Sequence, residues 1–396
     1  MNNPNDTVNK RDVKQLVSFV LLSALKFVGI TERTPVGLLI DVMIAAAIRN
    51  TSIEQASRSY EGAPSGKTVR THISLQLESL EDVEVRLNRG LRKHIPKKFR
   101  RKPIKVATDY IDVSYHGQVD ENVRNSKPKE GTSHFHTYAT AYAVEKGRRY
   151  TLAITYVRAT DSVLDVLKRL NKRLNLLGIR VELYLLDRGY NNVEVINWMI
   201  RYKKAFIMPM IARGKKSTPD QAATGSRRLK ESIVSRWDSY TMKSPKHGEA
   251  SFDVAICCTN YNGKHSKKGR RTFIYTTYGV RHHSLAWVRE TYRTRFGIET
   301  SYRQMREVKI KTSTTNAMVR YLYIGVAFII RNVWVWLHFH VFSKTQRGRI
   351  GRKIMLQRFS LEQMKSWICS AIAEIYILID QISIDQPLPR EILRFR

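Results

Sequence analysis

The order of strands and helices between residues 105 and 208 most constrains what this chain can fold into. Three β-rich runs come first, and the second and third are joined by a tight turn at Lys146-Gly147. Strands and helices then alternate, which is typical of crossover connections in an α/β fold. The expected strands are 105–115, 134–144, 148–158, 180–187 and 205–208, with a loop at 116–133 and helices at 161–177 and 193–202. The order βββαβαβ predicts a mixed sheet flanked by helices, the order of an RNase H-like core.

Two acidic residues interrupt these β-rich runs. Asp109 lies in KVATDYIDVSY and Asp187 ends the strand in VELYLLDRGYNN. Asp112 is a rival for Asp109, but residues three apart on a strand point to opposite faces, so only one of them can belong to a site. We favour Asp109, because it shares a face with apolar positions. The Arg188-Gly189 turn after Asp187 lets the backbone approach a phosphate or a metal ion.

A third acid lies in YRTRFGIETSYRQMR, residues 292–306, within one long helix expected from about 285 to 309. Spacings of three and four residues place five side chains on one helix face: Tyr292, Arg295, Glu299, Tyr302 and Arg306. An exposed face of ion pairs would explain this segment if it stood alone. Together with Asp109 and Asp187, however, Glu299 can complete a three-carboxylate site.

Two aspartates and a glutamate are an adequate ligand set for two Mg²⁺ ions, with Mn²⁺ as a possible substitute. Such a pair of ions, roughly 3.5–4 Å apart, activates an attacking hydroxyl and holds the leaving oxygen during phosphodiester transfer. We therefore expect Asp109 and Asp187 to bind both metals and Glu299 to close the site from its helix.

The charge of the chain points to a polyanionic partner. Its 396 residues carry 69 Lys+Arg against 34 Asp+Glu, a formal net charge of +35, which favours nucleic acid or an anionic membrane surface. The apolar stretch 321–342 is long enough to span a bilayer, but it contains Arg331, Asn332 and two histidines. We expect a buried helix there, with membrane association as the alternative. Three cysteines without metal-ligand spacing and a polar N-terminus favour the cytoplasm.

Composition changes along the chain predict five regions. They are an N-terminal helical domain (1–95), the first part of the core (96–209), a mostly β insertion (210–284), the second part of the core with the Glu299 helix (285–342), and a C-terminal helical region (343–396). Residues 51–80 resemble a helix-turn-helix, whose second helix would bring Lys67 and Arg70 to DNA; an ordinary helical hairpin is the alternative. In the insertion, a basic loop carries further candidate DNA contacts: Lys267, Lys268, Arg270 and Arg271.

The three acidic segments together resemble the DDE transposases of prokaryotic insertion sequences, in the group with the YREK signature. That signature places Tyr, Arg, Glu and Lys at set intervals; here Tyr292, Arg295 and Glu299 match it, and Arg306 stands at the Lys position. The resemblance covers roughly residues 105–340. It implies a metal-binding triad of Asp109, Asp187 and Glu299.

The resemblance also implies a partner and a reaction. Double-stranded DNA would be the substrate, held at the transposon ends by Tyr292, Arg295 and Arg306, with Tyr302 and Arg188 as further candidate contacts. Such proteins cut at inverted repeats as homodimers and join the freed 3′ ends to target DNA, without a small-molecule substrate. Arginine at 306 keeps the positive charge but changes its geometry.

Two other functions remain open at this point. A metal-dependent nuclease could use the same core without strand transfer. A catalytically inactive derivative could still grip its DNA ends. Both would work in the cytoplasm in association with the nucleoid, and all three readings depend on whether the side chains at 109, 187 and 299 converge in space.

Overall fold

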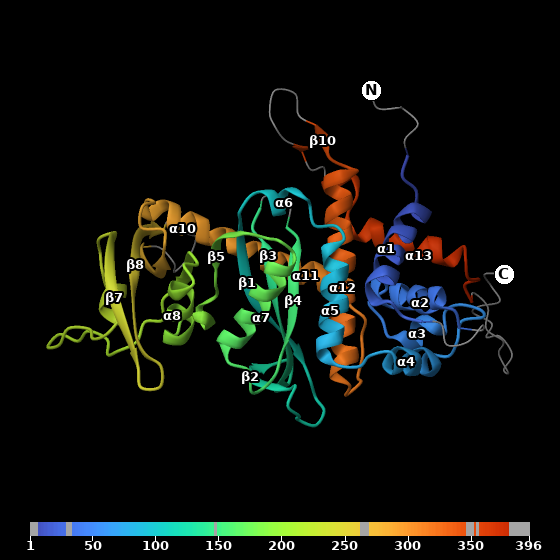
Figure 1. The fold of residues 1–396 in the computed structure, drawn as a ribbon, viewed down its shortest axis with the longest axis horizontal. Helices are drawn as coiled ribbons and strands as arrows, with labels where there is room; N and C mark the ends of the chain where they lie inside the picture. The colour runs from blue at the N-terminus through green and yellow to red at the C-terminus, as the bar shows by residue number, and fades with distance from the viewer. Residues whose placement is uncertain are drawn as a thin grey trace, which may run out of the picture.

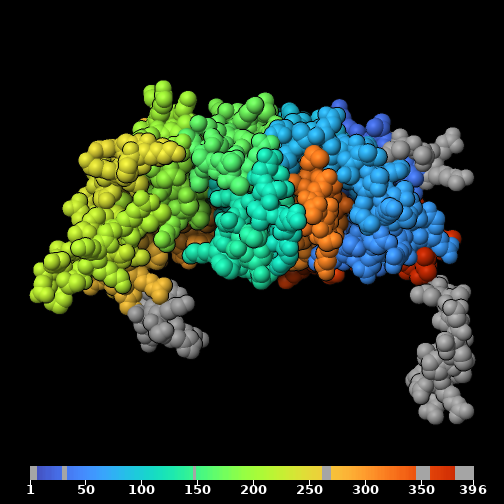
Figure 2. All heavy atoms as spheres, turned by 90° about the horizontal axis from the view of Figure 1, so that it is seen from below, coloured from blue at the N-terminus to red at the C-terminus, as the bar shows by residue number. Residues whose placement is uncertain are grey.

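The fold was analysed in a computed structural model, which describes residues 7–28, 34–145, 149–261, 269–345, 352–353 and 356–379. The molecule is elongated, with the sheet toward one end and a helical bundle at the other (Figure 1). Seen from below, the long helix α12 (Ala317–His340) lies between the sheet region and the N-terminal helices (Figure 2). The expected turn at Lys146-Gly147 lies outside the described residues.

Among the described residues, nine strands form one sheet. The five core strands have the order β4-β3-β1-β5-β6: β3 is antiparallel to β1 and β4, and β5 is parallel to β1 and β6. This arrangement confirms the mixed sheet expected from the sequence. The core strands are β1 (Ile104–Ser114), β3 (Thr132–Ala143), β4 (Thr151–Val157), β5 (Val181–Leu185) and β6 (Phe206–Pro209).

The loop expected at 116–133 is partly wrong, because it contains β2 (Arg124–Lys129), which pairs with the first residues of β3. Five of its six residues are exposed, so neither face shows the apolar alternation that identifies a strand. Backbone pairing to β3 alone makes β2 a strand.

The strands of residues 210–284 extend the core sheet. Strand β9 (Gly269–Tyr278) pairs antiparallel with β6, β8 (Gly248–Tyr261) pairs with β9, and β7 (Arg236–Ser244) forms the outer edge. The short helix α9 (Arg227–Lys230) precedes them. The β-rich character expected for this segment is present, and its strands are hydrogen-bonded to the core.

Helices cover both faces of the sheet. On one face lie α7 (Val163–Leu176) and α8 (Val193–Arg201); the Tyr184 hydroxyl donates to Asn171 of α7. On the other face lie α10 (Leu285–Arg293) and α11 (Gly297–Arg306); Tyr302 of α11 bonds to Thr140 of β3. Side-chain caps begin α7, α8 and α10, since Ser162, Asn192 and Ser284 each accept a backbone hydrogen bond from the first turn.

The uninterrupted helix expected from 285 to 309 is wrong. A 3-10 turn, η2 (Thr294–Phe296), separates α10 from α11. A 3-10 turn has three residues per turn instead of 3.6, so it rotates the residues that follow relative to those before it. Gly297, the first residue of α11, allows close packing here, because a Cβ would lie 3.0 Å from the Arg149 guanidinium carbon.

The remaining helices form the bundle. The first and last helices that the structure describes come together there, because α13 packs against α1 and α2. Between α3 and α4 the packing is very close, since a Cβ on Gly66 would lie 2.5 Å from the Glu54 Cα. The bundle and connecting elements are α1 (Lys10–Leu25), α2 (Val36–Ile48), α3 (Ile53–Ser57), α4 (Gly66–Leu75), α5 (Leu80–Arg92), α6 (Lys98–Arg101), α12 (Ala317–His340), β10 (Lys344–Thr345), β11 (Arg352–Lys353), η1 (Arg188–Tyr190), η3 (Leu356–Arg358) and α13 (Leu361–Ala373).

Helix α12 is the only helix in the described part of the chain that is long and apolar enough to cross a bilayer, and 94% of its most apolar window is buried. Its polar residues have partners inside the fold. Arg331 donates to the Arg149 carbonyl and Asn332 exchanges two hydrogen bonds with the Thr151 backbone. The buried-helix expectation therefore agrees with the packing.

Candidate active site

Asp109 and Asp187 reach the same point because their strands are parallel neighbours in register. Ala107 of β1 pairs with Leu185 of β5, and each aspartate lies two residues further along its own strand direction. Asp109 is in the middle of β1, while Asp187 follows the carboxyl end of β5 and precedes η1. The carboxyl ends of parallel strands are where open α/β sheets place their functional groups.

Arg295 connects the two carboxylates. One nitrogen, Nη2, lies 3.1 Å from Asp109 Oδ2 and 3.2 Å from Asp187 Oδ1. The arginine is 4% exposed and the Asp109 side chain 19%, so that ion pair is largely shielded from solvent, whereas the Asp187 side chain is 42% exposed. Buried charge requires such pairing. A single internal cation therefore stands between the two predicted metal ligands.

Asp109 has a perturbed acidity. Its pKa is raised from 3.8 to about 6: burial is the largest cause, the charges of Asp187 and Glu299 add to it, and Arg295 and the Tyr110 backbone N–H offset part of the rise. The N–H of Tyr110 donates to Asp109 Oδ1 at 2.9 Å. A carboxylate that stays largely ionised at neutral pH despite burial has a strong electrostatic demand for a second cation.

Glu299 approaches from α11 and is exposed. It lines the same cleft as Asp187 and is close enough to raise the pKa of Asp109. Two buried tyrosines hold its supporting helices: the Tyr292 hydroxyl donates to the Leu186 carbonyl, and the Tyr302 hydroxyl lies 2.7 Å from Thr140 Oγ1. The structure thus brings the three predicted acids into one neighbourhood.

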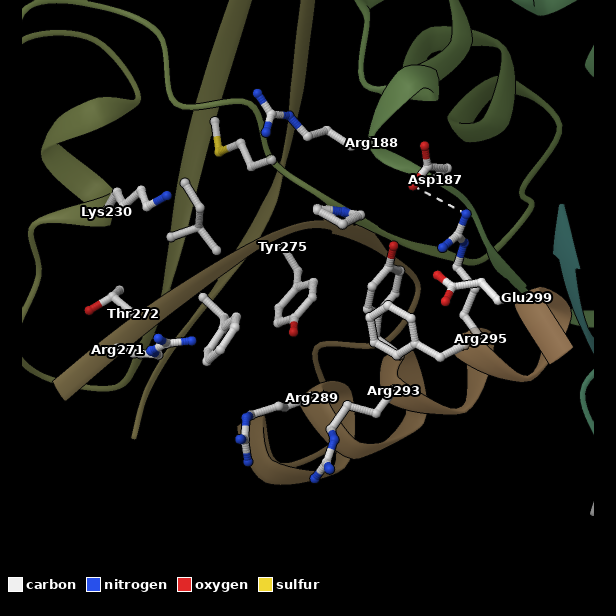
Figure 3. A pocket seen from close by; sticks show the side chains of 16 residues that line it. Asp187, Arg188, Lys230, Arg271, Thr272, Tyr275, Arg289, Arg293, Arg295 and Glu299 are labelled. Atoms are coloured by element: carbon white, nitrogen blue, oxygen red, sulfur yellow. Dashed lines mark ion pairs between the residues drawn. The ribbon is translucent and has the colours of Figure 1, made fainter. Parts of the chain in front are cut away.

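Asp187 and Glu299 border a basic cleft of about 760 Å³. Cations reach it from several sides: Arg289 and Arg293 of α10 from below, Lys230 of α9 and Arg271 of β9 from the left, and Arg188, next to Asp187, from above (Figure 3). The cations that line it are Arg188, Lys230, Arg271, Arg289, Arg293 and Arg295. Exposed Phe296 and half-buried Phe273 add apolar surface. Guanidinium groups around a cleft with carboxylates at one end suit a phosphodiester substrate.

The donor set fits a hard divalent cation in part. Carboxylate oxygens are the right chemistry, and two of them already converge on one cationic atom. Within the ranges that the structure describes, however, no three His, Cys, Asp or Glu side chains are close enough together to hold a metal ion. Two movements would be needed before these three acids could hold the ions. The Arg295 guanidinium would leave its position between Asp109 and Asp187, and Glu299 would move closer to them.

Three residues predicted to touch DNA are buried instead. Tyr292, Tyr302 and Arg295 are 6%, 8% and 4% exposed, and each has an internal partner. Tyr292 and Arg295 border the cleft with only these small fractions exposed, and Tyr302 does not line it. The three- and four-residue spacing predicted that these three side chains share one face. That face packs against the sheet, because the tyrosine rings and the guanidinium have partners there.

Other predicted contacts lie on the surface. Arg188 and Arg271 line the cleft, and Arg270 is exposed on β9. Arg306 is exposed at the end of α11 and borders a separate cavity of about 210 Å³. On α4, Lys67 is exposed and Arg70 pairs with Glu54 at 2.9 Å. Lys267 and Lys268 lie outside the described residues.

Sequence reasoning missed several lining residues. Arg289 and Arg293 are four apart on α10, a spacing that places them on one helix face and could have indicated a basic wall. Lys230 and Tyr275 carried no comparable signal, because tertiary folding brings α9 and β9 to the cleft.

Comparisons with known proteins complete the description. No family model matches the chain, and no curated protein matches it. Among solved structures, it is similar to a piggyBac transposase seen by cryo-electron microscopy in a synaptic complex with hairpin DNA, at 10% sequence identity and a TM-score of 0.49. The match covers 100% of this chain and 78% of that one.

Proposed function

We propose that the protein is a transposase that cuts DNA at the ends of a mobile element and joins the freed 3′ ends to target DNA. One observation carries the proposal: Asp109 and Asp187, on parallel neighbouring strands, lie within 3.2 Å of the same Arg295 nitrogen, with Glu299 on the rim of the adjoining cleft. The RNase H-like strand order and the basic cleft support it independently.

Each part of the site has a role. Asp109, Asp187 and Glu299 would hold two Mg²⁺ ions, or Mn²⁺ in their place, which supply an activated hydroxyl and stabilise the leaving oxygen. Arg188, Arg289 and Arg293 bind and orient the scissile strand by its phosphates. Tyr292 and Tyr302 fix the helix positions from beneath, through their hydrogen bonds to Leu186 and Thr140.

The test uses the full chain and the DNA that flanks its gene. Inverted repeats in that DNA supply a labelled end substrate, which is offered with a target plasmid and Mg²⁺. The intact protein should cut at the repeat and yield joined products from a pre-cleaved end. Asp187→Ala and Glu299→Gln should abolish both reactions and retain end binding within about threefold, a change of under 1 kcal/mol.

Two controls match these variants. Asp112→Asn removes an acid from the same strand as Asp109, where it accepts a hydrogen bond from Thr137. Glu290→Gln removes an exposed acid from α10 that pairs only with Arg289 and Arg293 among the described residues. Both should retain cleavage. Cutting without joining would identify a nuclease, and a wild-type protein that binds ends without cutting them would be an inactive derivative.

A further inference from the structure

A second cavity lies on the sheet face that carries α7 and α8. It has a volume of about 630 Å³ and is lined by side chains of these two helices together with Lys204. Lys168, Asn171 and Lys172 form the α7 wall, at the spacing that places them on one helix face. Trp198 and Tyr202, four apart, form the α8 wall. Figure 1 shows the two helices adjacent to one another over the strands.

The cavity is cationic without compensation. Lys168, Lys172 and Lys204 line it and no acidic side chain does. Across the ranges that the structure describes, no ion pair joins any of the three to a carboxylate. Burial lowers the pKa of Lys204, whose ammonium group lies 5.8 Å from the Tyr184 ring centre and 5.6 Å from that of Trp198. A half-buried cation that lies over two aromatic rings and beside other lysines is stabilised by an incoming anion.

Its aromatic wall is open to solvent. Tyr202 is 58% exposed, and its ring centre lies 5.4 Å from that of Trp198. Leu176, 61% exposed, extends the apolar surface across from them. Exposed aromatic rings beside lysines are the features on which nucleic acids stack bases or sugars while their phosphates meet cations.

The cavity is separated from the carboxylates by the sheet. Tyr184 points to α7, while Tyr292 of α10 packs against Tyr275 on the opposite face, with ring centres 5.2 Å apart. Tyr184 pairs with Phe206, and Phe206 with Tyr278, three residues from Tyr275 and therefore on the other side of β9. Because the sheet lies between the two sites, one stretch of DNA cannot fill the carboxylate cleft and this cavity at once.

We infer that the cavity between α7 and α8 binds a second segment of DNA, one that is not being cut, through phosphates on Lys168, Lys172 and Lys204 and through packing on Tyr202. The inference rests on the proposed function for its choice of partner. It predicts that the site serves joining, which needs two DNA segments, more than cutting, which needs one.

The first experiment measures binding of labelled duplex DNA by anisotropy, with full-length protein carrying Asp187→Ala so that no cleavage occurs. Each phosphate contact contributes about 0.9 to the slope of log affinity against log salt. Lys168→Gln/Lys172→Gln should lower this slope by about 1.8, so that between 50 and 200 mM salt the variant loses roughly tenfold less affinity than its parent. The matched control is Lys243→Gln/Lys246→Gln, which removes the same charge from the β7–β8 turn and should change the slope by less than half as much.

A second experiment locates the DNA. A benzophenone side chain introduced at position 202 should crosslink to duplex DNA, whereas the same group at Phe19, 59% exposed on α1, should not. In the active protein, Lys168→Gln/Lys172→Gln should cut ends within about twofold of the wild-type rate and join them at least fivefold more slowly.

The outcomes separate this inference from the proposed function. An unchanged salt slope together with no crosslink at 202 would overturn the inference, even if the wild type cuts and joins DNA. Equal losses of cutting and joining would overturn the assignment to an uncut segment. If the wild type cuts nothing, the proposed function fails, and the slope and the crosslink still report on the cavity.

Discussion

Replacing Asp109 by asparagine should stabilise the folded protein at neutral pH while removing its chemistry. Asp109 is 19% exposed in its side chain, and burial raises its pKa from 3.8 to about 6 even with Arg295 beside it. The folded state therefore disfavours the ionised carboxylate relative to the unfolded chain. A pKa raised by this amount corresponds to about 3 kcal/mol of stability lost when the group is ionised.

The sign and the pH window follow from the two pKa values. Below pH 3.8 the carboxyl is neutral in both states and contributes no difference. The penalty grows as pH rises from 3.8 to about 6 and is fully present above it. Asparagine resembles the neutral acid, so Asp109→Asn should exceed the wild type in free energy of unfolding by about 3 kcal/mol at pH 7.5 and about 1 kcal/mol at pH 4.5. At pH 7.5 this is a rise in Tm of about 3 °C.

Denaturant and thermal unfolding of both proteins, with a chelator present, measure this difference across the pH range. Asp112→Asn is the control, because it makes the same carboxylate-to-amide replacement on the same strand. Added Mn²⁺ should raise the Tm of the wild type more than that of Asp109→Asn, because it offsets the ionised pair. A variant that is no more stable than the wild type at pH 7.5, or a gain that does not shrink on acidification, would refute the reasoning.

Four further predictions address the site and the scaffold. Arg295→Gln should raise the pKa of Asp109 above 6, because Arg295 lowers it. The acid limb of the pH–rate profile should therefore move to higher pH in Arg295→Gln and stay near the wild type in Arg295→Lys. An acid limb that does not move in Arg295→Gln would contradict the ion pair. Asp41→Ala should destabilise the helical bundle by about 3–5 kcal/mol in denaturant titrations, because it leaves the buried Lys14 ammonium without the carboxylate that lies 2.8 Å from it. The double change Lys14→Met/Asp41→Leu should recover most of the loss. Gly325→Ala should lower stability by about 1–3 kcal/mol, since its Cβ would lie 2.2 Å from Leu87 on α5, with Gly37→Ala, where nothing lies within 4 Å, as the comparison. Ser162→Ala should lower the free energy of unfolding by about 1 kcal/mol through loss of the α7 capping box. An unchanged unfolding transition in calorimetry would show that this cap does not stabilise the protein.

Local sequence patterns were sufficient for the order of the core elements. β-rich runs predicted β1 and β3, and the helices expected to begin at 161 and 193 begin at Val163 (α7) and Val193 (α8). These signals depend on neighbours a few residues apart, which is the range over which periodicity and capping act. Strand β2 was not predicted, because its backbone pairing with β3, and not its side-chain pattern, makes it a strand.

The sequence by itself determined the order of the core strands and of the helices between them, the positive charge and the three acidic positions, because each depends on residues close together along the chain. Only the tertiary structure decided that Asp109 and Asp187 share one Arg295 nitrogen, that Tyr292 and Tyr302 face inward, and that α13 returns to pack on α1. The physical reason is that convergence depends on the parallel pairing of β1 with β5 and on which helix face the sheet covers. Those are properties of the whole packed molecule, and no window of neighbouring residues contains them.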